Sequence, residues 1–248
     1  MVIKSSDLEV KNMVFSKLED HSYITSQKIS LISYNGEGRK LLCQTPEFLT
    51  ETYGIPREGP FYTTARSRAF YKLPFCHDRH QYPEQVDYTL IEGLYNKFRE
   101  IDKHCDTDEF RLQMFGDKQA AKYTYQPLIR DGETIEDEAA TATGYYRPPY
   151  TKVKLDLMRD TDEPCFRLWE KTQDGRKEIA LKSFNDILKH MRFMTKHRII
   201  IHFSKLYAMK TASGNEKKKY GIVLKAFAVE CENKALQQIE TEEDIFMD

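Results

Sequence analysis

The order of hydrophobic patterns in the C-terminal half constrains the fold more than any other feature of this sequence. Apolar and polar side chains alternate over residues 150–158, which predicts a half-buried strand. An Asp-Gly turn at 174–175 separates two further strand-like runs, and the next segment repeats its apolar residues at helical spacing. The predicted order is strand, strand, strand, helix, strand, strand, at 150–158, 165–171, 176–182, 184–193, 197–210 and 220–232.

A helix between the third and fourth of five antiparallel strands is the arrangement of the OB fold. The sequence therefore predicts an α+β, mainly β protein, whose core at 146–234 is an OB-fold-like five-stranded antiparallel barrel. Residues 1–145 are expected to add a β-hairpin and a helical insertion that pack on this barrel. The hairpin is expected at 27–34 and 39–45, around Asn35-Gly36, and the helix at 87–104.

Charge is unevenly distributed, although the formal net charge of the 248 residues is only −1. The last ten residues carry five acidic side chains and no lysine or arginine, so residues 235–248 are expected to form an acidic tail. Between Lys182 and Lys225 there are eleven basic residues and two acidic ones. A basic body of this kind suits a polyanionic partner, although a solvated surface of an ordinary protein explains it equally well.

Aromatic and basic residues interleave along several predicted strands. Binders of single-stranded nucleic acid need this mixture, because cations follow the phosphates and flat rings stack on unpaired bases. Each aromatic could instead belong to the core, so the prediction concerns the set more than its members. The candidate nucleic-acid-binding residues are Tyr62, Arg66, Arg68, Tyr71, Lys72, Tyr145, Tyr146, Arg147, Tyr150, Lys152, Lys154, Arg167, Trp169, Lys171, Arg198, Lys205, Tyr207 and Lys210.

Two other kinds of chemistry receive weaker support. Cys76, His77 and His80, with the adjacent pair His104 and Cys105, lack the close ligand spacing of zinc sites, so we expect no metal. The acidic residues at 156, 160, 162 and 163 form one local cluster, whereas two-metal nucleases collect carboxylates from several elements. Motifs for phosphate-binding loops, nucleophile elbows and zinc proteases are absent. We therefore expect neither an enzyme nor a cofactor, and a metal-dependent nuclease is the least favoured function.

Several protein classes are excluded by composition. There is no apolar run of about 18 residues, so we expect no membrane span, and residues 1–12 lack the apolar core of a signal peptide. The five cysteines have long spacings and contain no Cys-x-x-Cys pair, which is typical of reduced thiols inside a cell.

Six short runs resemble the single-stranded-DNA-binding proteins of nucleocytoplasmic large DNA viruses. The C-terminal runs look like the start and the closing strands of that family's second half, and two N-terminal runs are also similar. These runs are RPPYTKVKL at 147–155, KHRIII at 196–201, KLYAMKTASG at 205–214, YGIVLK at 220–225, NMVFS at 12–16 and LLCQTP at 41–46. Little of the family can be matched over residues 46–145.

The resemblance implies an OB-fold protein that coats single-stranded DNA during viral replication, recombination or repair, without catalysis. It implies an intracellular location, in the host cytoplasm or the nucleus. RNA is a possible ligand, oligomers are possible, and the acidic tail would recruit replication proteins. The alternative function is a viral protein-interaction, late transcription or scaffold factor that does not bind nucleic acid directly and uses the tail and the acidic loop at 131–144 as contact elements.

Overall fold

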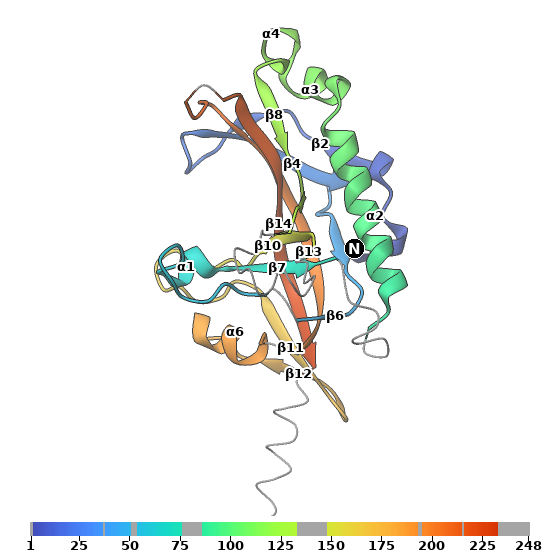
Figure 1. Ribbon diagram of the computed structural model, residues 1–248, viewed down its shortest axis with the longest axis vertical. Helices are drawn as coiled ribbons and strands as arrows, with labels where there is room; N and C mark the ends of the chain where they lie inside the picture. Colours follow the sequence, from blue (N-terminus) through green and yellow to red (C-terminus); the bar gives the residue numbers. More distant parts are fainter. Residues whose placement is uncertain are drawn as a thin grey trace, which may run out of the picture.

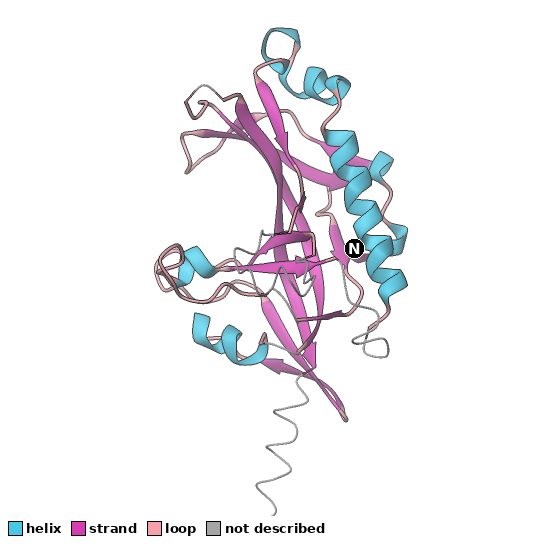
Figure 2. Cartoon of the chain, in the orientation of Figure 1, coloured by secondary structure: helices cyan, strands magenta, loops and turns pink. Residues whose placement is uncertain are grey.

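The computed structural model describes residues 2–36, 38–50, 54–75, 86–132, 148–192, 195–214 and 216–232. These residues form a mainly β protein in which a curled sheet joins fourteen strands and the helices lie at the periphery (Figures 1 and 2). The prediction of a mainly β fold is confirmed. None of the helices within the described ranges combines the length and the apolar character needed to cross a bilayer.

Two long antiparallel strands, β13 (Lys196–Met209) and β14 (Lys218–Glu232), form the centre of the sheet. Both were predicted as the closing strands. On one side, β13 pairs with β4 (Gln27–Tyr34), β5 (Leu42–Gln44) and β6 (Phe48–Leu49). The N-terminal strands therefore belong to the same sheet as the C-terminal ones.

The far edge of β14 differs from the predicted antiparallel set. Three strands pair with it one after another, all in parallel: β8 (Tyr123–Gln126), β10 (Tyr150–Lys154) and β11 (Arg167–Thr172). β14 has fifteen residues, or roughly 50 Å at 3.3 Å per residue, which gives one edge room for three short partners. A five-stranded antiparallel barrel is thus not what the described strands form.

The remaining strands extend this framework. β7 (Phe70–Pro74) and β9 (Ile129–Arg130) pair with β10, and β12 (Gly175–Ile179) forms the predicted hairpin with β11. β1 (Val2–Lys4) joins β5, while β2 (Met13–Phe15) and β3 (Glu19–Asp20) join β4. The shorter helical elements are η1 (Ser5–Asp7), η2 (Val10–Asn12), α1 (Ala65–Arg68), α3 (Asp108–Phe115), α4 (Asp117–Ala120) and α6 (Phe184–His190).

The predicted N-terminal hairpin is present only as a turn. Asn35 and Gly36 have positive φ angles of 57° and 69°, as an Asn-Gly turn requires. Beyond the turn, a single bridge between Ser33 and Lys40 is formed. β5 pairs instead with β13 and β1, and its successive residues Leu42 and Cys43, which point to opposite faces, are both buried.

Helix α2 (Tyr88–Cys105) covers one face of the central strands. Its buried residues Ile91, Leu94, Phe98, Ile101 and Cys105 recur every three or four positions, as predicted for 87–104. The Phe98 ring meets the ring of Phe203 on β13 edge to face, with centroids 5.8 Å apart. In Figure 1, α2 lies to the right of β13 and β14, whereas α1 and α6 lie to the left. The face of β13 that points away from α2 is therefore not part of this core.

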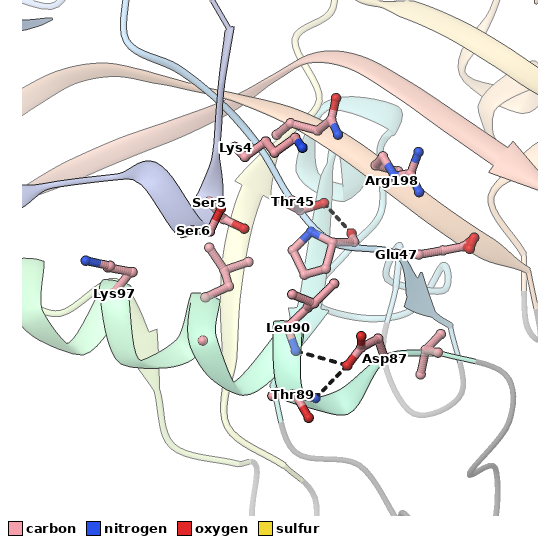
Figure 3. A pocket seen from close by; sticks show the side chains of 15 residues that line it. Lys4, Ser5, Ser6, Thr45, Glu47, Asp87, Thr89, Leu90, Lys97 and Arg198 are labelled. Atoms are coloured by element: carbon pink, nitrogen blue, oxygen red, sulfur yellow. Dashed lines mark hydrogen bonds between the residues drawn. The ribbon is translucent and has the colours of Figure 1, made fainter.

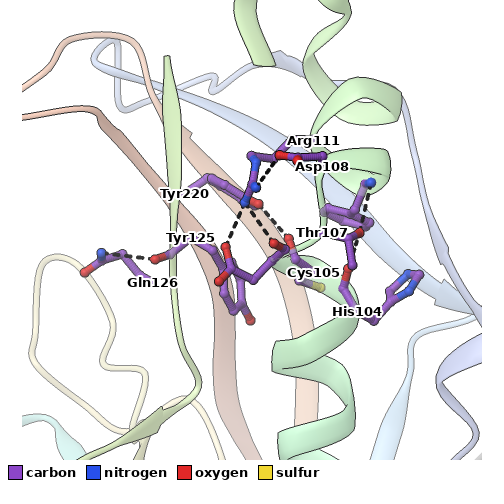
Figure 4. Close-up of polar contacts among 10 residues, drawn as sticks. His104, Cys105, Thr107, Asp108, Arg111, Tyr125, Gln126 and Tyr220 are labelled. Carbon is purple, nitrogen blue, oxygen red and sulfur yellow. Dashed lines mark hydrogen bonds and ion pairs between the residues drawn. The ribbon is translucent and has the colours of Figure 1, made fainter. Parts of the chain in front are cut away.

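A polar cluster connects the start of β14 to the C-terminal end of α2 (Figure 4). The buried Tyr220 hydroxyl donates to the carbonyl oxygen of Cys105 at 2.6 Å. Arg111 on α3 donates to Asp106 at 2.8 Å and to Asp108 at 2.6 Å. Burial raises the pKa of the Cys105 thiol to about 12. This cysteine is therefore a packed, protonated thiol of the core.

Candidate nucleic-acid interface

The outward positions of β13 carry several partly accessible polar residues. Alternate residues from Ile199 to Phe203, followed by Leu206 and Ala208, are fully buried against the α2 side. The residues between them, which are partly accessible, are Arg198, Ile200, His202, Ser204, Lys205, Tyr207 and Met209. We call the side of the sheet that they share the outer face.

Two irregularities in the β13–β14 ladder change which residues share this face. The register shifts between Ile200 and Ile201, and again between Phe203 and Lys205. An extra residue in one strand inverts the alternation beyond it. Because of the second shift, His202 and Lys205 both point outward although they are three positions apart.

Strand pairing brings basic residues from three strands together on the outer face. Lys154 of β10 is the partner of Lys225 of β14, and Lys225 in turn is the partner of His202 of β13. Paired residues lie on the same face of a sheet, and Lys152 shares this face because it is two residues from Lys154. We call these five side chains the cationic row: Lys152, Lys154, Lys225, His202 and Lys205.

One carboxylate opposes the charges of the cationic row. Asp156 accepts hydrogen bonds from Lys154, at 2.9 Å, and from Lys225. Burial acts to raise the pKa of Asp156, but the two lysines outweigh it and hold this pKa below its usual value. The side chains of Lys154 and Lys225 remain 56% and 28% exposed. Two lysines thus share one acid, and positive charge is left over.

Crowding of like charges is visible in two other members of the row. Burial lowers the pKa of His202, and the charges of Lys40 and Lys225 lower it further. Burial also lowers the pKa of Lys205, with additional effects from Lys225 and Lys154. A site that resists further positive charge in this way favours an anion.

Aromatic rings lie at both ends of the cationic row. The Lys152 ammonium lies 4.7 Å from the centroid of the Phe70 ring, and this ring is 5.7 Å from that of Tyr62. At the other end, Tyr207 is half-buried and lies over Gly221, where a Cβ atom would come within 3.3 Å of its ring. Lys152, Lys154, Lys205, Tyr207 and Tyr62 are predicted residues that the structure places on or beside one surface.

A second group of predicted residues gathers around Trp169, and its cations are paired with carboxylates. Trp169 and Arg198 line a hollow of about 270 Å³ at one end of the outer face. Arg198 and Arg176 both pair with Glu230. The other charged neighbours are also matched, since Arg167 pairs with Glu178 and Lys171 with Glu232. Two arginines and one glutamate line this Trp169 hollow, so it offers a polyanion less positive charge than the cationic row does.

Three predicted binding residues are corrected by their burial. Tyr71 is 0% exposed and Tyr150 is 6% exposed, so neither ring can stack on a base. Lys72 is also buried, and its ammonium lies 5.0 Å from the centroid of the Tyr150 ring. Tyr71 belongs to the face of β7 that packs in the core, where burial of an aromatic ring stabilises the fold.

Three other predicted residues are already paired, and three more lie outside the described residues. Arg66 pairs with Asp162 at 2.6 Å, and Arg68 with Glu58 at 3.6 Å. Lys210 pairs with Asp20 at 2.9 Å. Tyr145, Tyr146 and Arg147 lie outside the described residues, as do the acidic tail and most of the loop at 131–144.

A larger hollow at the start of α2 is less suited to an anion. It measures about 880 Å³, and Lys4, Lys97 and Arg198 lie around it (Figure 3). The side chain of Asp87 already accepts from the backbone N–H groups of Thr89 and Leu90 there, and Lys97 lies near Glu9 and Glu100. Asp87 therefore caps the N-terminus of α2, and the two glutamates offset the charge of Lys97.

The acidic and metal-ligating residues considered in the sequence analysis can also be located in the structure. Asp156 is held by two lysines and Asp162 by Arg66, so these acids do not converge on one point. Within the described ranges no group of three or more metal-ligating side chains is found, and Cys76, His77 and His80 fall outside them. His104 is exposed, and the adjacent Cys105 is buried.

Sequence reasoning missed Lys225, His202 and Asp156 as parts of this surface. Lys225 and His202 occupy outward positions of predicted strands, so the alternation pattern held a usable signal for them. Asp156 was grouped with the acids that follow it in the sequence. Its role depends on Lys225, which is 69 residues away and adjacent only after folding.

Comparison with known proteins finds a distant sequence similarity to a viral protein. No family model matches the sequence. It is 24% identical, over 268 aligned positions, to an uncharacterized protein of Acanthamoeba polyphaga mimivirus. The alignment takes in 91% of this chain and 62% of the mimivirus protein, so the chain spans less than two thirds of that relative's length.

Proposed function

We propose that this protein binds single-stranded nucleic acid, DNA in the first place, without sequence preference and without catalysis. The cationic row is the observation that supports this proposal. It brings basic side chains from three adjacent strands together, and the carboxylate of Asp156 offsets only part of their charge. Adjacent strands lie about 4.8 Å apart, so the row follows a path of roughly 10 Å across the sheet. A path of this kind suits a phosphate backbone.

The rings beside the row favour an unpaired strand over a duplex. Tyr62 and Phe70 at one end and Tyr207 at the other are partly accessible, and Phe61, next to Tyr62, is 90% exposed. Bases of a single strand can stack on such rings, with a gain of about 1–3 kcal/mol each, whereas paired bases cannot. Stacking tolerates any base, so no sequence code is required.

Two further features support a viral replication setting. The similarity to a mimivirus protein fits the resemblance to viral single-strand binders. The chain order β10, β11, β12, α6, β13 and β14 matches the order of strands and helix from which an OB-type core was expected. Membership of that family, an OB-type origin of this sheet and recruitment of replication proteins by the acidic tail belong to the same proposal.

Anisotropy of a fluorescent oligo-dT tests the proposal directly. If four phosphates contact the four lysines of the row, log Kd should rise with log salt with a slope of about 2.8. That slope corresponds to a roughly 50-fold loss of affinity between about 50 and 200 mM salt. Oligo-U and duplex DNA serve as comparisons. Failure of oligo-dT to bind at low ionic strength, or binding that is insensitive to salt, contradicts the proposal.

The substitution Asp156→Asn is expected to strengthen binding. It removes the carboxylate that Lys154 and Lys225 share, and it keeps the size of the side chain. Affinity for oligo-dT should rise by roughly threefold to tenfold at low salt, because the two lysines no longer divide their attraction between Asp156 and the phosphates. Asp162→Asn, which frees Arg66 away from the row, is the control and should change affinity little. Unchanged or weaker binding by Asp156→Asn means that DNA does not follow the row.

A further inference from the structure

The protonation state of Lys205 can be inferred from its hydrogen-bond partner. Its Nζ atom lies 2.7 Å from Nε2 of His21. The other ring nitrogen, Nδ1, accepts from the backbone N–H groups of Tyr23, at 3.1 Å, and Ile24, at 3.3 Å. Nδ1 therefore carries a lone pair, and the proton of the neutral ring is on Nε2.

With the proton on Nε2, Lys205 can only be the acceptor in its hydrogen bond with His21. Because Nε2–H of His21 is a donor, Nζ of Lys205 must accept, and an ammonium group has no lone pair with which to do so. The geometry thus favours an uncharged amine at Lys205. A charged lysine would place two N–H groups against each other at 2.7 Å.

The surroundings of Lys205 favour the uncharged state. Lys225 on β14 and Lys154 on β10 face it with positive charge, and Asp156 acts in the opposite direction. On β4, its cross-strand partner is the apolar Leu31. Burial and the two lysines lower the pKa of Lys205, and burial is the main cause that lowers that of His21. Hydrogen bonding and electrostatics therefore agree.

We propose that Lys205 is a proton-coupled anchor for a phosphate group. In the free protein it is an uncharged amine bound to His21, and it becomes an ammonium when a phosphate diester arrives on the cationic row. The proton comes from solvent, and Nε2–H of His21 turns to water or to a phosphate oxygen. The nature of the ligand rests on the proposed function, whereas the state of Lys205 in the free protein does not.

Trace acetylation followed by peptide mass spectrometry measures the state of Lys205 in the free protein, because only the uncharged amine reacts. The pH at which Lys205 reaches half of its maximal reactivity, its midpoint, should be lower in the folded chain than in the urea-unfolded chain. Lysines of the unfolded chain titrate at about pH 10.4. His21→Ala should move the midpoint upward, because the donor to the uncharged amine is lost. Equal midpoints in the folded and unfolded chains overturn the inference.

Adding inorganic pyrophosphate tests the coupling without DNA. Pyrophosphate should raise the folded midpoint of Lys205, because a bound anion favours the ammonium. The same addition should have no such effect after Lys154→Gln and Lys225→Gln, which remove most of the row's remaining charge. A midpoint that pyrophosphate leaves unchanged in the wild type overturns the coupling.

Oligo-dT binding then separates this inference from the proposed function. Between about pH 7 and pH 9.5 an ordinary lysine stays charged, yet wild-type affinity should fall by up to tenfold per pH unit above the Lys205 midpoint. Lys205→Arg stays charged throughout, so it should lose this dependence and bind at least as tightly as the wild type at pH 7. Tight binding with equal pH dependence in both proteins overturns the inference and leaves the proposed function intact. Absence of oligo-dT binding overturns the proposed function, and the pyrophosphate experiment still decides the anchor.

Discussion

Replacing Lys154 and Lys225 together with glutamine is expected to weaken binding to oligo-dT by roughly 30- to 100-fold at low salt. Each lysine lost from a phosphate contact removes a favourable charge and one released counterion. The carboxylate of Asp156 then faces the DNA without its partners and adds repulsion. The slope of log Kd against log salt should fall by about 1.4, because single strands contribute about 0.7 for each charge.

A matched control removes the same amount of charge elsewhere. Arg167→Gln with Lys171→Gln also deletes two cations, but both are on β11, where Glu178 and Glu232 compensate them. This variant should bind oligo-dT within about threefold of the wild type. Thermal melts of both double variants verify that the sheet is intact. Equal losses in the two variants would mean that binding responds to overall charge and not to the cationic row.

Acidification is expected to destabilise the protein through His197. This ring is fully buried on β13, with Nδ1 at 2.8 Å from the Thr50 hydroxyl, which also lies 2.7 Å from the Tyr71 hydroxyl. Burial lowers the pKa of His197 to about 3. In the unfolded chain the same ring titrates near 6.5.

The sign of the effect follows from proton counting. Between about pH 6.5 and about pH 3 the unfolded state binds a proton that the folded state does not, so the free energy of unfolding falls as pH falls. The slope for one such proton is about 1.4 kcal/mol per pH unit, and the accumulated loss is on the order of 3–5 kcal/mol. Urea unfolding from pH 8 to pH 4 measures it.

The variant His197→Phe tests whether this residue is the source. It keeps a ring in the site and leaves the hydrogen bond between Thr50 and Tyr71. Its acid dependence should be shallower by one proton. His202 and His21, whose pKa values are also lowered, should continue to contribute in the variant. Parallel stability curves for the wild type and His197→Phe would place the acid sensitivity in other groups.

Local patterns in the sequence predicted the elements well where one face of an element is buried. The apolar stripe of 87–104 became α2, and the Ser183–Asp186 capping box begins α6 as predicted. The strands at 27–34, 197–210 and 220–232 were placed within two residues of their observed bounds. In each case the pattern of burial repeats at the period of the element itself, so neighbours in sequence carry the signal.

The binding residues were predicted less evenly. Lys154, Lys205 and Tyr207 do share the outer face, whereas Tyr71 and Tyr150 have the same composition around them and are buried. Arg167 and Arg198 are accessible, but carboxylates from other strands compensate them. An aromatic or basic residue on a strand can belong to either face of the sheet. The local sequence pattern does not show which residue of a neighbouring strand it will contact.

The sequence by itself determined that the chain is mainly β, where its principal strands and helices begin, and that basic and aromatic residues accompany those strands. Tertiary structure alone decided that β10 and β11 run parallel to β14, and that a ladder irregularity turns His202 and Lys205 to the same side. It also brought Asp156 to Lys225 and His21 to Lys205. The physical reason is that strand register and ion pairing depend on residues far apart in the chain, whereas burial periodicity is written into neighbouring residues.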